Sequence, residues 1–148
     1  YPLRRQRQMC IRDRGWGARG GKPYCFEKCE WTGKVPFEVH EMRARNDGFE
    51  LTFTQPVDPA TAGDVKSYTM REFVYAYREA YGGEEIDEIL PTVTSAKVAP
   101  DGKSVRLTVS KLTKGHIHEL HFDGVKNTAG QPLLHKVGYY TLNEIPQK

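Results

Sequence analysis

Short segments in which apolar and polar residues alternate, separated by turn signals about every ten residues, constrain the fold of this chain most strongly. An alternation with a period of two predicts strands that bury one face and expose the other. Two segments show it most clearly, with apolar positions Phe49, Leu51 and Phe53 in the first and Val105, Leu107 and Val109 in the second. The chain is therefore expected to be built from strands.

Turn residues group these strands into hairpins. Residues 46–48 (Asn-Asp-Gly) lie between two extended segments, which is a strong signal for a tight hairpin, and residues 100–102 (Pro-Asp-Gly) predict a second one. Further strands are predicted in residues 67–77, 115–125 and 137–142.

Helix signals are scarce. Asp58 can cap a helix that has Pro59 at its first position, but Gly63 follows within about a turn. Residues 82–90 carry four acidic side chains and predict a solvated loop or a short helix at an edge.

These elements indicate an all-β fold, an antiparallel β-sandwich of about seven short strands. A length of 148 residues fits one domain, or one domain and a fragment of another. The sequence has no apolar run of 18 or more residues, so no membrane span is predicted.

The positive charge is concentrated at the start of the chain. Residues 1–14 contain five arginines and one aspartate, which leaves 17 basic and 18 acidic residues in the remainder. Residues 4–14 resemble the translation of a transposon-based sequencing adapter, so we expect residues 1–14 to be disordered and foreign to the protein. Without them no basic patch remains, and no nucleic-acid partner is expected. The natural protein is then expected to extend further upstream, and its signal peptide to be missing.

Histidines are the main candidates for metal ligands. His116 and His118 lie two residues apart on a predicted strand and share a face, an arrangement that can bind zinc or copper. However, both share parity with Leu120, which predicts that His118 faces the core and that His116 lies at the strand mouth. His121 has the opposite parity. The sequence therefore favours no metal site, with His116 and His118 as the candidates if one exists.

Catalytic motifs are absent from the sequence. It contains no G-x-S-x-G and no phosphate-binding glycine loop in its usual context. We therefore expect no catalytic and no cofactor-binding residue in this chain. Two roles are open for its tyrosines and tryptophans. They can form a surface on which sugars stack, or they can pack within the domain and against a neighbouring one.

A family resemblance lies in residues 35–143. The phrases "FELTFTQPVDPATAGDVKSYTM" and "DGKSVRLTVS", with "GVKNTAGQPL" after the next strand, resemble bacterial Ig-like domains of the surface-layer type. The resemblance implies a sandwich over residues 35–148. It also implies an inward-facing side chain at His118, where such domains usually have tyrosine.

Residues 15–44 resemble the junction that follows a glucose/sorbosone-dehydrogenase-like β-propeller in large secreted bacterial proteins, some of which carry haem-binding modules. The resemblance implies that residues 15–34 end an upstream domain or form a linker, and that the propeller is a partner in the same chain. It also implies a secreted or periplasmic location and a parent protein that oxidises sugars with a quinone. None of the propeller's catalytic or cofactor residues can be assigned here, so no cofactor is expected.

The hypothesis is then a non-catalytic accessory module, with Trp16 and Trp31 as candidates for the contact between domains. Two alternatives remain. One is a carbohydrate-binding module that uses exposed aromatic side chains. The other is a metal-binding protein that uses His116 and His118 with a more distant histidine.

Overall fold

The computed structural model describes residues 30–79 and 82–147. The chain divides into two units, residues 1–34 and Val35–Lys148, and every described helix and strand belongs to the second. The adapter-like segment 4–14 and Trp16 lie outside the described residues. No helix in the described ranges has the length and apolar character needed to cross a membrane.

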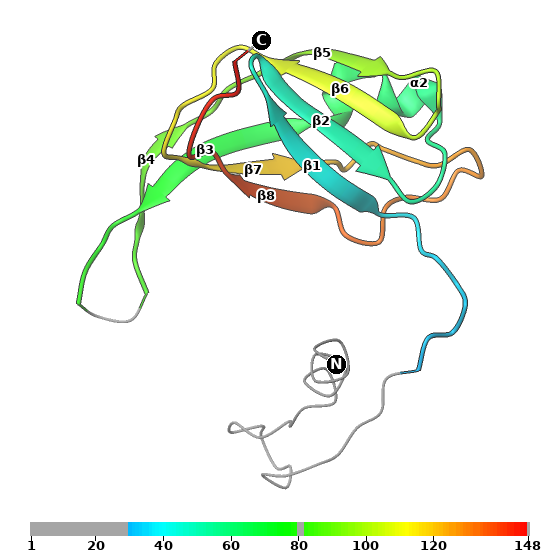
Figure 1. The fold of residues 1–148 in the computed structure, drawn as a ribbon, viewed down its shortest axis with the longest axis horizontal. Coiled ribbons are helices and arrows are strands. Elements are labelled where there is room, and N and C mark those ends of the chain that lie inside the picture. The colour runs from blue at the N-terminus through cyan, green and yellow to red at the C-terminus, as the bar shows by residue number, and fades with distance from the viewer. Residues whose placement is uncertain (1–29, 80–81, 148) are drawn as a thin grey trace, which may run out of the picture. The chain divides into compact units, whose positions relative to one another are not determined.

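One layer of the second unit is a four-stranded antiparallel sheet (Figure 1). Its strands follow the order β1 (Val39–Arg45), β2 (Gly48–Phe53), β6 (Ser104–Val109) and β5 (Val93–Val98). The hairpins β1–β2 and β5–β6 therefore lie side by side, with β2 and β6 at the centre.

The other layer is also a four-stranded antiparallel sheet. Its order is β4 (Glu85–Ile89), β3 (Thr69–Tyr75), β7 (Ile117–His121) and β8 (Val137–Thr141). Two such sheets, facing each other across an apolar core, confirm the predicted all-β sandwich.

Both predicted hairpins are present. Arg45 pairs with Gly48 across the first turn, and a Cβ atom at Gly48 would lie 2.1 Å from the carbonyl oxygen of Leu107, so only glycine allows β6 to approach this closely. In the second turn Gly102 has a φ of 64°, and the Asp101 carboxylate accepts hydrogen bonds from the backbone of the residues that follow.

The prediction of a loop or short helix in residues 82–90 was wrong, because residues 85–89 form the strand β4. β4 lacks a clear alternation of apolar residues and owes its strand conformation to pairing with β3. Its register shifts near Asp87, a residue with a φ of 56°, which aspartate tolerates better than most side chains. β3 and β4 together extend beyond the neighbouring strands (Figure 1).

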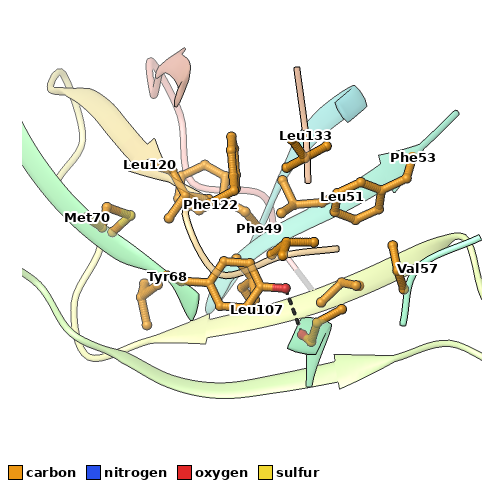
Figure 2. Packing of buried hydrophobic residues seen from close by; sticks show 14 of the residues in the cluster. Phe49, Leu51, Phe53, Val57, Tyr68, Met70, Leu107, Leu120, Phe122 and Leu133 are labelled. Atoms are coloured by element: carbon orange, nitrogen blue, oxygen red, sulfur yellow. Dashed lines mark hydrogen bonds between the residues drawn. The ribbon is translucent and has the colours of Figure 1, made fainter. Parts of the chain in front are cut away.

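The chain passes from the first sheet to the second through two short helical turns, α2 (Pro59–Ala62) and a 3₁₀ turn (Val65–Ser67). Asp58 caps α2 as predicted, since its carboxylate accepts from the amide of Ala60. Just after this connection, the buried hydroxyl of Tyr68 donates to the carbonyl of Ala62 at 2.7 Å (Figure 2). This bond ties the start of β3 to the end of α2.

The core lies between the two sheets (Figure 2). The alternating residues predicted for β2 and β6 are all buried, and they meet apolar side chains from the second sheet and from the loops. The second group comprises Met70, Leu120, Phe122, Val125 and Leu133.

Phe49 offers a direct test of this packing. Its ring is fully buried and contacts the rings of His118 and Tyr140. We expect Phe49→Ala to lower the free energy of unfolding by about 3–5 kcal/mol, because it removes a large buried ring and leaves a cavity.

Tyr139→Ala is the matched control, since Tyr139 is also a strand aromatic but is 63% exposed. We expect it to change the free energy of unfolding by less than about 0.5 kcal/mol. Urea denaturation of both variants measures this, and equal losses would contradict the assigned core.

Candidate functional site

Four of the five histidines each contact a different carboxylate. The pairs join separate parts of the fold in three of the four cases. They are His116–Asp87 at 3.0 Å, His118–Glu72 at 2.9 Å, His121–Glu119 at 2.7 Å and His135–Glu38 at 2.6 Å. The imidazoles are thus distributed over the domain, each beside its own acidic partner.

His116 and His118, the candidate metal ligands, do not form a shared site with a third ligand. The Nε2 atom of His116 lies against Asp87 of β4, while the Nε2 atom of His118 lies against Glu72 of β3. Within residues 30–79 and 82–147 no group of three or more histidine, cysteine or acidic side chains could hold a metal ion. His116 lies just before β7 and His118 within it, and both are buried.

Glu72 and His118 form a pair that is completely enclosed between the sheets. They are directly opposite each other on β3 and β7, and both side chains have zero exposure. Burial opposes ionisation of the Glu72 carboxyl, but the His118 ring and the Thr113 hydroxyl hold its pKa below the usual value. Glu72 is therefore a buried carboxylate.

A second polar cluster lies on the outer face of the β4–β3–β7–β8 sheet. Its centre is Arg71, whose guanidinium donates to Glu119 at 2.6 Å and to Glu85 at 2.6 Å. The other oxygen of the Glu119 carboxylate lies 2.7 Å from Nε2 of His121. The cluster links β4, β3 and β7.

Hydrogen bonds are the largest cause of the pKa shifts of Glu119 and Arg71 in this cluster. The bond from Arg71 lowers the pKa of Glu119, with a further contribution from His121, although partial burial opposes it. The bonds to Glu119 and Glu85 likewise raise the pKa of Arg71. These groups keep opposite charges and hold one another in place.

Aromatic side chains on the same face surround this cluster. Phe73 is buried beneath the guanidinium of Arg71, which lies 4.6 Å from the ring centroid, and Tyr75 contacts the ring edge-on. Tyr75 and Tyr139 themselves are largely exposed. Of the two predicted inter-domain tryptophans, Trp31 has a side chain that is 74% exposed, and Trp16 falls outside the described residues.

Among the described residues, open grooves lie on two parts of the sandwich surface. The larger, about 420 Å³, is lined by the 3₁₀ turn, the start of β3 and the connection from β4 to β5. The other, about 320 Å³, lies along β1 and β8 and includes His40, Glu38 and His135. Neither groove is lined by the enclosed Glu72–His118 pair.

Sequence reasoning missed Glu72 and Arg71. Glu72 lies between Met70 and Val74 in the inward-facing positions of β3, so a charged residue in an apolar pattern was the available signal. For Arg71 no comparable signal exists, because its three carboxylate partners come from other segments of the chain.

Comparison with known proteins gives a likeness of fold. No model of a known protein family matches, and neither does any curated protein. Solved structures of the bacterial S-layer protein SbsC match with 23% identity and a TM-score of 0.56 over 74% of this chain. They include SbsC residues 31–844, of which the match covers 14%, and its N-terminal part, of which it covers 24%. The likeness shows that this chain shares its all-β fold with part of SbsC.

Arg71→Met tests the outer cluster. A carboxyl whose pKa is lowered by folding stabilises the fold above the pKa of the unfolded chain, about 4.3 for glutamate, and loses that contribution as the pH falls. We therefore expect the destabilisation caused by Arg71→Met to be greatest at neutral pH and to shrink between pH 5 and pH 3.

Arg43→Met is the control, since Arg43 pairs with the exposed Glu41 on the other sheet. We expect only a small effect from it at every pH. Urea titrations at pH 7, 5 and 3 measure both variants, and a loss for Arg71→Met that is independent of pH would show that the charges are not responsible.

Proposed function

We propose that residues 35–148 are a non-catalytic Ig-like structural module of a bacterial protein located outside the cytoplasm. The observation that carries this proposal is the separate pairing of four histidines with four carboxylates. General acid–base or metal chemistry needs such groups to converge on a substrate, whereas here they connect strands and loops of one sandwich. This pattern favours a mechanical role.

The fold likeness supports the same proposal. The matched structures belong to an S-layer protein. This chain covers 24% or less of the length of each of them. A module of this size would act as one element of a longer chain. An extracellular or cell-surface location is part of the proposal.

At a finer level, we propose that the module is the C-terminal accessory domain of a secreted sugar-dehydrogenase-like protein, in some cases associated with haem modules. An upstream β-propeller of the same chain is then its partner. Trp16 and Trp31 remain the candidates for the contact, because they precede the sandwich in the chain. Sequence resemblance alone supports this finer proposal.

Carbohydrate binding is the second candidate function. The specific observation in its favour is that Tyr75 and Tyr139 are exposed on the same sheet face as the Arg71–Glu119 pair. Aromatic rings that flank fixed hydrogen-bonding groups suit the apolar faces and hydroxyls of a sugar. Such a surface would add adhesion to the structural role.

Two assays test the structural proposal on the whole chain. We expect no oxidation of glucose in the presence of pyrroloquinoline quinone and an electron acceptor, and no change in Tm with Zn²⁺, Cu²⁺ or the quinone, because only bound ligands raise stability. Quinone-dependent turnover would overturn the non-catalytic proposal. A rise in Tm with Zn²⁺ that His116→Ala removes would favour the metal-binding alternative.

Sedimentation with insoluble polysaccharides tests the second candidate. If the tyrosine face binds sugar, Tyr139→Ala and Tyr75→Ala should each weaken retention by about tenfold, as expected for the loss of one stacking contact of roughly 1.4 kcal/mol. Thr108→Ala, on the outer face of the other sheet, is the control. If all three variants were retained on the polysaccharide as strongly as the unmutated chain, carbohydrate binding by the tyrosine face would be ruled out.

A further inference from the structure

We propose that Glu72 and His118 form a buried binding site for one proton, which the domain takes up when it folds at neutral and mildly alkaline pH. The site is distinct from the outer cluster and independent of the proposed structural role. Because the pair is buried in the core and binds a proton, it makes the free energy of unfolding of the sandwich depend on pH.

The atoms around the His118 ring provide the main argument. The Nδ1 atom lies 3.2 Å from the backbone carbonyl oxygen of His116, and the Nε2 atom lies 2.9 Å from Oε1 of Glu72. A carbonyl oxygen and a carboxylate oxygen are both acceptors. A neutral imidazole has one N–H group, so its other nitrogen would lie close to an acceptor oxygen with no proton to offer it.

Only two arrangements avoid such a contact. Either His118 carries protons on both nitrogens beside an ionised Glu72, or His118 carries one proton on Nδ1 and Glu72 is protonated and donates to Nε2. Both arrangements hold the same number of protons, one more than a neutral histidine and a free carboxylate. The low pKa of Glu72 favours the first arrangement, in which the proton is on the ring.

The surroundings prevent water from replacing either partner. Both side chains have zero exposure, and the ring of Phe49 on β2 contacts the His118 ring at 5.3 Å between centroids. A lone charge in such an environment costs several kcal/mol, so neither partner can ionise without the other.

Other titratable and polar groups near the pair come from each neighbouring element. The segment before β7 contributes Thr113 and His116, β4 contributes Asp87, which contacts His116, and β8 contributes Tyr140, opposite His118. None of these groups is a lysine or arginine that could replace His118 as the partner of Glu72. The Glu72 oxygens, the Thr113 hydroxyl and Nε2 of His118 are buried and lack hydrogen bonds of good geometry, so the close ionic contact between His118 and Glu72 is what compensates the buried carboxylate.

The direction of the pH dependence follows from proton counts. Above about pH 6.5 the unfolded chain loses the histidine proton while the folded pair keeps it, so the unfolded state binds fewer protons and stability falls as the pH rises. The unfolding equilibrium constant should then increase by up to tenfold per pH unit until the folded pair releases its proton. Below about pH 4.3 the unfolded glutamate is protonated, and stability falls with decreasing pH.

Glu72→Gln is the decisive variant. The glutamine amide has nearly the same shape and can donate to Nε2 of a neutral His118, so the contact survives without the extra proton. Between pH 6.5 and 8.5 we expect the unfolding constant of Glu72→Gln to rise less steeply than that of the unmutated chain. The difference between the two rises should be up to tenfold per pH unit.

Glu38→Gln is the matched control, because it changes the carboxylate beside His135, which is mostly exposed. It should keep the natural slope. Urea denaturation of the whole chain at several pH values measures all three slopes, and a natural slope in Glu72→Gln would overturn the proposal.

Nuclear magnetic resonance of the natural chain tests the proposal even if Glu72→Gln does not fold. At pH 8 we expect the ¹⁵N signals of His118 to show two protonated ring nitrogens, or the ¹³C signal of Glu72 to show a protonated carboxyl. Either result places the proton in the pair. A ring with one proton beside an ionised Glu72 would overturn it.

Discussion

The packing of four central strands against one another is the constraint on which the rest of the structure depends. β2 and β6 bring their apolar faces against β3 and β7, and each further element extends or closes this contact. Sheets packed in this way leave little freedom in register, because a shift by one residue would turn every apolar side chain outward. The positions of the buried pair, the outer cluster and the exposed tyrosines are consequences of that register.

The same register explains why charged groups occur on both sides of one sheet. Arg71 and Glu72 are neighbours on β3 and point to opposite faces, so one enters a partly exposed ion cluster and the other an enclosed ion pair. The outer cluster resembles an ordinary surface network that salt and solvent weaken. The inner pair is shielded from both, so the loss of one partner alone would leave an uncompensated charge in the core.

Local signals made much of the fold predictable from sequence, whereas features that depend on tertiary pairing were not. The two hairpins and the Asp58 cap depend on neighbouring residues, and their predictions are confirmed. β4 was missed because its acidic residues form a strand only when β3 and Arg71 are beside them. The inward position of His118 followed from alternation, but its partner Glu72 lies on a strand far away in the sequence.

The exposed border of β4 has a consequence for how this domain can exist in a long chain. It is the outermost strand of its sheet, three of its five residues are acidic, and its backbone is bent at Asp87. A strand from another molecule would have to add along a distorted, negatively charged edge, which natural proteins use to discourage aggregation. At this edge, neighbouring copies of the domain can therefore come close together in a long chain or at high concentration without their sheets joining.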